Sequence, residues 1–250
     1  FATKGNLNNH IGVPLSLLSI KEDHEMAIIE MGANHVGEIA QLSEISQPTH
    51  GLITNIGKAH IGLFGGIEGI IRGKSELYDY LIRKGGTIFV NQNQEILMNM
   101  SKRMQNPIFY PNIGSYCPCE LLGADPFVKL RNEAGKTVVT QLVGKYNFDN
   151  IATALCIGKF FDVSADQAVE AIAGYQPANN RSQIIKKGTN TIILDAYNAN
   201  PSSMEKAIEN LAQSKSKNKV AIVGDMFELG DDEQKEHEAV GMLLKDQGIH

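Results

Sequence analysis

Short apolar runs alternate with helix-like segments along most of the chain. The first apolar runs cover residues 26–31, 51–56 and 87–91, and segments with helical spacing between them cover residues 37–46 and 67–83. This alternation predicts a mostly parallel sheet with helices on its faces. Because ligands of open parallel sheets bind at the carboxyl ends of the strands, we expect Glu30 and Asn55 to lie at a binding edge.

The pattern is less regular between about residues 107 and 143. Short runs at residues 121–122 and 137–142 indicate strands, and residues 132–136 fit a hairpin turn. We therefore expect a small antiparallel excursion here. Two helices are predicted next, over residues 147–161 and 164–173, and Ser164 and Gln167 have the spacing of a capping box at the start of the second.

A polar segment at residues 174–180 is the predicted domain linker. After it the alternation restarts, with predicted strands at residues 191–195 and 219–224 and predicted helices at residues 201–212 and 233–245. The fold class is therefore α/β. We expect a central domain over residues 1–177 and the start of a Rossmann-like domain over residues 178–250.

Composition narrows the class of protein. Hydrophobic residues make up 42% and charged residues 20%, and the formal net charge is -5. These values are typical of a globular protein and argue against general binding to nucleic acid or to anionic membranes. The sequence has no apolar run near the ~20 residues of a membrane helix. Cys117, Cys119 and Cys156 do not have zinc-site spacing. We expect a reduced, cytoplasmic, monomeric protein without nucleic-acid or membrane partners.

One polar set follows the first two predicted strands. Glu30 ends the first strand, His60 follows the second, and Lys74 lies in the next predicted helix. A carboxylate and an imidazole at neighbouring strand ends can hold a divalent ion beside phosphates. The alternative is an ordinary surface carboxylate, a loop histidine and a solvated lysine.

A second polar set lies nearer the C-terminus. Asn147 and Asn150 open a predicted helix, where they either cap it or pair with an adenine. Asp195 and Asn198 belong to a polar run between a strand and a helix, which suits ribose hydroxyls or an anion, although a capped turn explains it equally. Arg181 is either a solvated linker residue or a phosphate clamp.

Several longer strings together resemble the Mur ligase family. They are ATKGNLNNHIGVPLSLL (2–18), IIEMGANHVGEIAQL (28–42), TNIGKAHIGLFGG (54–66), GKSEL (73–77), GKYNFDNIATAL (144–155), LDAYNANPSSM (194–204) and VGDMFELG (223–230). The last two and GNLNNHIGVP are typical of the branch that adds D-alanyl-D-alanine to UDP-N-acetylmuramoyl tripeptide. The similarity covers nearly the whole chain and is weakest from about residue 95 to 140.

This resemblance implies an ATP-dependent amide-bond ligase of peptidoglycan precursor synthesis, acting through an acyl phosphate. It implies that Glu30 and His60 are Mg²⁺ ligands and that Lys74 is a lysine carbamylated in many such ligases. Asn147 and Asn150 match positions near the adenine. Arg181 and Asp195 match nucleotide contacts, and Asn198 lies close to them.

The sequence departs from the family pattern in one respect. No Gly-x-x-x-x-Gly-Lys-Ser/Thr phosphate loop occurs in it. We therefore expect a fragment without the phosphate loop, the N-terminal domain and the end of the last domain, and inactive by itself. Two alternatives stay open. One is a sibling ligase that adds glutamate to folate or another amino acid to a muramyl precursor, although residues 194–230 favour the dipeptide-adding branch. The other is a non-catalytic binding module.

Overall fold

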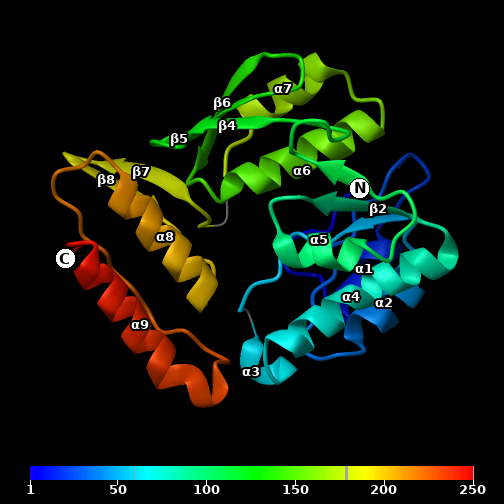
Figure 1. Cartoon of the computed structure of the whole chain (residues 1–250), viewed down its shortest axis with the longest axis horizontal. Helices are drawn as coiled ribbons and strands as arrows, with labels where there is room; N and C mark the ends of the chain where they lie inside the picture. The colour runs from blue at the N-terminus through cyan, green and yellow to red at the C-terminus, as the bar shows by residue number, and fades with distance from the viewer. Residues whose placement is uncertain (59, 178–179, 250) are drawn as a thin grey trace. The chain divides into compact units, whose positions relative to one another are not determined.

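The computed structural model describes residues 1–58, 60–177 and 180–249, and its elements are labelled in Figure 1. The chain forms two compact units. Unit 1 contains Phe1–Val90 and Gln94–Ile108, and unit 2 contains Asn91–Asn93 and Phe109–His250. The expected domain boundary after residue 177 falls beside residues 178 and 179, which lie outside the described residues, so it stays a prediction.

Unit 1 joins helices to a small parallel sheet. Its elements are α1 (Gly12–Leu18), α2 (Glu38–Ser46), β1 (His50–Leu52), α3 (Ile61–Phe64), α4 (Ile67–Lys84), β2 (Thr87–Asn91) and α5 (Glu95–Ser101). β1 and β2 are parallel, with His50 opposite Thr87 and Leu52 opposite Phe89. With β3 (Ile108–Tyr110), the strand order is β1-β2-β3. These elements confirm the predicted α/β class and the predicted strand at residues 87–91, whereas the strand predicted at residues 51–56 is present only at residues 51 and 52.

Helix α4 organises the core of unit 1. Ile70, Leu77 and Leu81 recur at helical spacing and are buried, and Figure 1 shows α2 lying beside this helix. Burying each such side chain contributes about 1.5–3 kcal/mol. Gly73 permits a close approach, because a Cβ there would meet Cε1 of Phe64 at 2.6 Å. Any larger residue would have to displace the Phe64 ring, which belongs to α3.

The first predicted strand, residues 26–31, is wrong as a strand. Only Ile28 forms a bridge, parallel to Ala2, and Ile28 is 62% exposed. An apolar run indicates extended backbone, but a strand also needs a neighbour along its length. The segment is nevertheless tied to residues 1–3, since Ile28 N–H donates to the Phe1 carbonyl and Thr3 N–H to the Ile28 carbonyl.

Unit 2 begins with an antiparallel sheet. Its strands are β4 (Glu120–Gly123), β5 (Phe127–Arg131) and β6 (Thr137–Val143), in that order. Helices α6 (Asn147–Phe160) and α7 (Ala165–Gly174) pack against it, as Figure 1 shows. This confirms the expected antiparallel excursion and both helices. The hairpin turn over residues 132–136 is confirmed as well, because Asn132 N–H donates to the Lys136 carbonyl.

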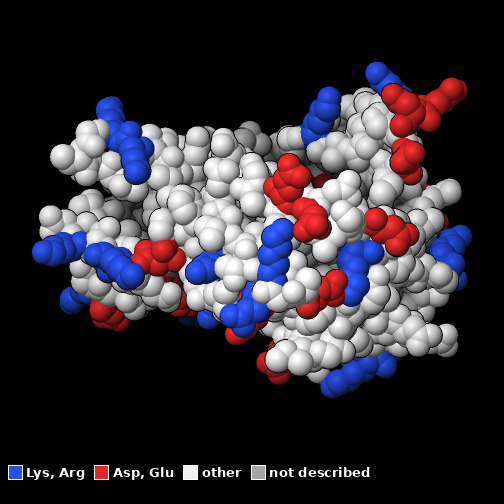
Figure 2. Space-filling view, turned by 90° about the horizontal axis from the view of Figure 1, so that it is seen from above, with Lys and Arg blue, Asp and Glu red and all other residues white. Residues whose placement is uncertain are grey.

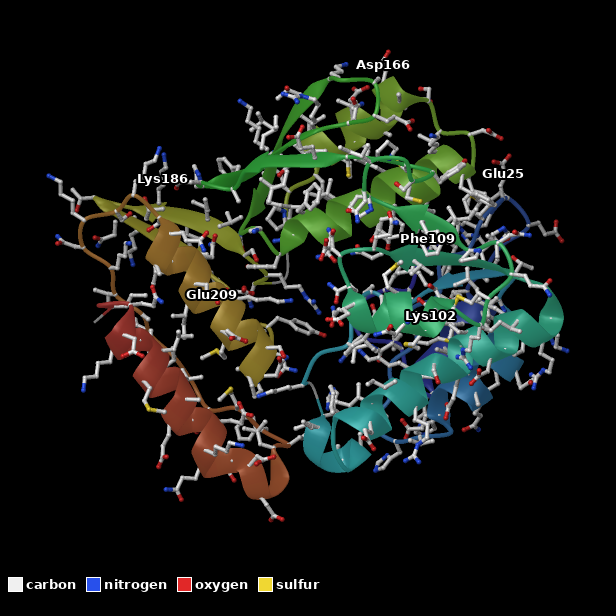
Figure 3. The ribbon with its side chains drawn as sticks, in the orientation of Figure 1. Glu25, Lys102, Phe109, Asp166, Lys186 and Glu209 are labelled. Atoms are coloured by element: carbon white, nitrogen blue, oxygen red, sulfur yellow. The ribbon has the colours of Figure 1, made fainter. Side chains whose placement is uncertain are left out.

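The start of α7 shows how the sequence specifies a helix boundary. Ser164 Oγ accepts the Gln167 N–H and Gln167 Oε1 accepts the Ser164 N–H, both at 3.3 Å. The predicted capping box is therefore confirmed. Asp166, labelled in Figure 3, lies in the first turn and pairs with Lys136 at 3.1 Å. A negative charge at this end also suits the helix dipole.

The remainder of unit 2 is a hairpin followed by paired helices. The hairpin consists of β7 (Gln183–Lys187) and β8 (Asn190–Leu194), and the helical elements are α8 (Pro201–Gln213), η1 (Gly230–Asp232) and α9 (Glu233–Asp246). Helices α8 and α9 pack together. The predicted strand at residues 219–224 is wrong, because no strand is assigned there and Ile222 is 98% exposed. Extended backbone becomes a strand only with a partner, and the described residues supply none.

Two surface features complete the fold. On the face seen in Figure 2, acidic and basic side chains are interspersed among large uncharged areas. Among the residues that the structure describes, no helix combines the length and the apolar character needed to cross a bilayer.

Candidate functional site

Helix α4 and the segment that follows β1 meet through two side chains one helical turn apart. Lys74 Nζ donates to the Asn55 carbonyl at 2.9 Å. Tyr78 Oη accepts the Ile53 N–H at 3.3 Å, and the Tyr78 ring is fully buried. Residues at i and i+4 share a helix face, so α4 holds the carboxyl end of β1 at two points. The sequence predicts only that Asn55 lies at a binding edge, and the structure adds that its carbonyl contacts Lys74.

Lys74 is in an environment that disfavours its ammonium form. The side chain is half-buried, and this burial lowers the pKa of the amine. The hydrogen bond to the Asn55 carbonyl fixes where the nitrogen sits. Lowering the pKa increases the neutral fraction of the amine at any given pH, and only the neutral amine is a nucleophile.

Glu30 lies on the extended segment after Ile28 and is exposed. Its Oε1 accepts a hydrogen bond from Asn8 Nδ2 at 2.8 Å, and its N–H donates to Thr3 Oγ1 at 2.9 Å. The carboxylate is therefore oriented through one oxygen. Asn8 was not predicted as a site residue, although it belongs to the string GNLNN.

His60 begins helix α3 with left-handed backbone, at a φ of 57°. Its carbonyl accepts the Leu63 and Phe64 N–H groups, which starts the helix turn. Left-handed backbone at a non-glycine residue is uncommon and is found preferentially in turns and at functional sites. The preceding Ala59 lies outside the described residues.

Glu30, His60 and Lys74 are called the metal-side group below. The structure places all three in unit 1, on separate segments, with different hydrogen-bond partners for Glu30 and Lys74. Among the described residues, no set of three His, Cys, Asp or Glu side chains is arranged to hold a metal ion. The donors present fit Mg²⁺ only in its usual protein mode, in which one or two side chains bind it and phosphates and water complete the shell.

Asn147, Asn150, Arg181, Asp195 and Asn198 are called the nucleotide-side group, and all lie in unit 2. Asn147 is buried in the first turn of α6. Its Nδ2 donates to the Val143 carbonyl at 2.8 Å, and its Oδ1 accepts from Asn150 Nδ2 at 3.1 Å. The structure thus brings the two asparagines together. Asn147 positions Asn150, and Asn150 is the exposed member of the pair.

Asp195 follows β8 and takes part in a hydrogen-bonded cluster. Its Oδ2 accepts from Tyr146 Oη at 3.2 Å and its Oδ1 from the Ser182 N–H at 3.4 Å. Tyr146 Oη and Ser182 Oγ are 2.6 Å apart. Burial, together with the Asp195 carboxylate, raises the pKa of Tyr146 to about 12. The phenol stays protonated and remains a hydrogen-bond donor.

Arg181 stacks on an aromatic ring beside this cluster. Its guanidinium carbon lies 3.9 Å from the centroid of the Tyr197 ring. Asn198 Oδ1 accepts the Ala199 N–H at 2.9 Å, and Asn200 caps α8 through a capping box with Ser203. Asn200 therefore supplies the capped turn that was the alternative to a ligand site. Asn198 lies two residues before this cap and is exposed.

Tyr146, Ser182 and Tyr197 contact predicted site residues but were missed from the sequence. Tyr146 lies within the string GKYNFDN and Tyr197 within LDAYNAN, so each is adjacent to a predicted residue. Ser182 is 4% exposed and has a φ of 50°. A left-handed serine has no sequence signal, and its partner Asp195 is 13 residues away.

The cysteines form a separate region of unit 2. Cys117, Glu133 and Lys159 line a pocket of about 150 Å³. Cys117, Cys119 and Cys156 are free thiols, and burial raises the pKa of Cys119 and of Cys156 to about 12. Thiols with such pKa values are poor nucleophiles at neutral pH.

Two family profiles match the chain. The profile of the Mur ligase middle domain matches residues 1–158. The profile described as Mur ligase, glutamate ligase domain matches residues 180–249.

Individual proteins are similar over the same extent. The UDP-N-acetylmuramoyl-tripeptide--D-alanyl-D-alanine ligase of Bacillus subtilis is 32% identical, over 99% of this chain and 54% of its own length. A crystal structure of MurF from Acinetobacter baumannii has 34% identity and a TM-score of 0.88, over 98% of this chain and 55% of that one. MurF ligase from Thermotoga maritima, in complex with ADP, has 27% identity and a TM-score of 0.86, over 98% and 57%. This chain therefore spans about half the length of the relatives that it matches.

Proposed function

The chain belongs to the Mur ligase family, and from this we propose that the protein carrying it is an ATP-dependent ligase of peptidoglycan precursor synthesis. The proposed reaction joins D-alanyl-D-alanine to UDP-N-acetylmuramoyl tripeptide in the cytoplasm. Relatives with that printed name, similar over nearly the whole chain, support this substrate pair. The family ranges, which end at residue 158 and restart at residue 180, support a domain boundary near residue 177.

The proposed chemistry has two stages. ATP transfers its terminal phosphoryl group to the substrate carboxylate, and the dipeptide amine then attacks the acyl phosphate and displaces inorganic phosphate. Both stages bring anions together. A magnesium ion held by Glu30 and His60 would offset that repulsion and orient the reacting oxygens. In unit 2, Asn150 would contact the adenine, and Arg181, Asp195 and Asn198 the rest of the nucleotide.

The observation that carries the proposal is the environment of Lys74. Burial lowers the pKa of its amine, and the Asn55 carbonyl holds the nitrogen at the end of β1. A neutral lysine amine can form an N–C bond to carbon dioxide and release a proton. The resulting carbamate is an anion with oxygen donors, which suits Mg²⁺ where an ammonium would repel it. We propose this modification for Lys74.

The test is substrate-dependent release of phosphate from ATP by the protein at its full encoded length. We expect release only when both UDP-N-acetylmuramoyl tripeptide and D-alanyl-D-alanine are present. Turnover with glutamate and a folate, or with a single amino acid and a muramyl precursor, would instead identify a sibling ligase. Binding of nucleotide without turnover on any of these substrates would identify a non-catalytic module.

The carbamate has a test of its own. Incubation with ¹³C-labelled bicarbonate should give a carbamate signal in the ¹³C spectrum that is missing from a Lys74→Arg variant. A spectrum identical for the two proteins would leave Lys74 as an unmodified phosphate contact.

A further inference from the structure

Glu30 is an exposed carboxylate whose position matters for the proposed function. A free glutamate side chain loses conformational entropy when a ligand fixes it. The structure reduces that cost in advance, because Asn8 Nδ2 donates to Glu30 Oε1 at 2.8 Å. An ionised carboxylate only accepts hydrogen bonds, so the amide nitrogen of Asn8, and not its oxygen, must face it.

Asn8 is itself held at its backbone. Its carbonyl accepts the Gly32 N–H at 2.8 Å, and its own N–H donates to the Asn6 carbonyl at 2.8 Å. The next residue, Asn9, accepts the Ile11 and Gly12 N–H groups through Oδ1, immediately before α1. The backbone that carries the Asn8 amide is therefore anchored on both sides.

Gly32 leaves room for this arrangement. A Cβ at Gly32 would meet Asn8 Nδ2 at 2.9 Å and Asn8 Cγ at 3.0 Å. These distances are too short for a methyl group, so any side chain at position 32 would displace the Asn8 amide. Gly32 donates its N–H to the Asn8 carbonyl and has no Cβ, and both features allow the Asn8 side-chain amide to reach the Glu30 carboxylate.

We infer that Asn8 is a positioning residue that orients Glu30 for a divalent cation. Asn8 occupies Oε1 and leaves Oε2 for the cation, so Glu30 binds through one oxygen. This inference rests on the proposed function, because it takes Glu30 to be a metal ligand. Groups that hydrogen-bond to a metal ligand commonly change metal affinity by about 10- to 100-fold when removed.

The test measures binding of Mn²⁺ alone to the full chain, from the electron paramagnetic resonance signal of the free ion. We expect Asn8→Ala and Gly32→Ala each to weaken Mn²⁺ binding by about 10-fold. Asn8→Ala removes the hydrogen-bond donor and Gly32→Ala displaces it. The double variant should therefore bind Mn²⁺ no more weakly than either single variant. Circular dichroism melts of each variant establish that it is folded.

Two matched controls separate positioning from general loosening. Gly241→Ala adds a methyl group where nothing lies within 4 Å and should leave Mn²⁺ affinity unchanged. Asn9→Ala removes the acceptor of the Ile11 and Gly12 N–H groups, and it leaves the contact between Asn8 and Glu30 in place. Equal loss of Mn²⁺ affinity in Asn9→Ala and Asn8→Ala would overturn the inference.

Glu30→Gln distinguishes this inference from its premise. Unchanged Mn²⁺ affinity in Glu30→Gln would reject Glu30 as a metal ligand, and with it the metal site of the proposed function. Weaker binding in Glu30→Gln but normal binding in both Asn8→Ala and Gly32→Ala would keep that metal site and reject the role of Asn8. Weaker binding in all three variants supports both.

Discussion

The metal-side group of unit 1 and the nucleotide-side group of unit 2 are prepared in different ways. In unit 1, Glu30 and Lys74 are each oriented by one neighbour, Asn8 or the Asn55 carbonyl. In unit 2, the candidate side chains contact one another, nearby side chains or backbone groups. The Asp195 carboxylate, for example, accepts hydrogen bonds through both of its oxygens.

This difference determines which existing hydrogen bonds a ligand must replace when it binds. A cation at Glu30 can use the second carboxylate oxygen without breaking the bond to Asn8. A ribose at Asp195 must replace or share the contacts with Tyr146 and Ser182, so part of its binding energy is offset by the lost bonds. Substitutions in the metal-side group should therefore remove activity, whereas those in the nucleotide-side group should change affinity.

The largest effect is expected at Lys74. In the protein at its full encoded length, Lys74→Ala should lower kcat by about 100-fold or more, because it would remove the proposed carbamate and, with it, a ligand of the magnesium ion that would offset the developing negative charge. Acetate or formate should restore part of the rate by standing in for the carbamate. Lys84→Ala, at the end of the same helix, is the matched control and should stay near the wild-type rate. A Lys74→Ala protein with normal kcat would contradict the proposed role.

A smaller effect is expected at Arg181. Its guanidinium stacks on Tyr197, and lysine keeps the charge but loses the planar contact and the forked donors. Arg181→Lys should raise the KM for ATP by about 3- to 10-fold and change kcat little. Arg131→Lys, which alters an exposed ion pair with Glu120, is the control. A large fall in kcat with unchanged KM would contradict the expectation that the nucleotide-side group affects affinity and not the rate of the chemical step.

Helices α2, α4, α6, α7, α8 and α9 were predicted from the sequence because their signals are local, whereas α1, α3 and α5 were missed. Helices α2, α4, α8 and α9 match their predicted ranges to within one or two residues. Apolar residues at helical spacing, a proline in the first turn and capping residues are all read within a short window. β5 carried a comparable signal, since Phe127–Arg131 alternates between buried and exposed positions, but it was missed.

The strands and the site contacts were harder because they depend on distant partners. Residues 26–31 and 219–224 are apolar enough for strands, yet pairing decides whether they become strands. In the site, the residue types were predictable and their partners were not. Asn8 is 22 residues from Glu30, and Tyr146 is 49 residues from Asp195. Nothing in the residues themselves indicates which polar side chain will face which across such separations.

Tyr146→Phe tests whether the hydrogen bonds within the nucleotide-side group lower its affinity for the nucleotide. Removing the hydroxyl frees one oxygen of Asp195 and leaves the Ser182 bond. Since a neutral hydrogen bond contributes about 0.5–1.5 kcal/mol, ADP should bind about 2- to 10-fold more tightly. Isothermal titration calorimetry measures the change. Weaker ADP binding would mean that Tyr146 supports the bound state, and the contrast between the two groups would fail.

The smallest effects are expected in the pH dependence of stability, where the two groups should differ in sign. Burial lowers the pKa of Lys74, so between its folded pKa and its ordinary value of 10.5 the unfolded chain binds more protons than the folded chain. The free energy of unfolding then rises with pH through that window. Tyr146 has a pKa raised to about 12 from 10.0. Its contribution is complete below pH 10 and is lost as the pH rises toward 12.

Urea unfolding from pH 7 to pH 11 can separate these contributions by difference. The wild-type free energy of unfolding minus that of Lys74→Met should increase with pH, because methionine fills similar space and does not titrate. The corresponding difference for Tyr146→Phe should stay level to about pH 10 and then fall. A flat difference for Lys74→Met would show that its amine is not buried in solution. The main support for carbamylation would then be lost, although the contact between Asn8 and Glu30 would be unaffected.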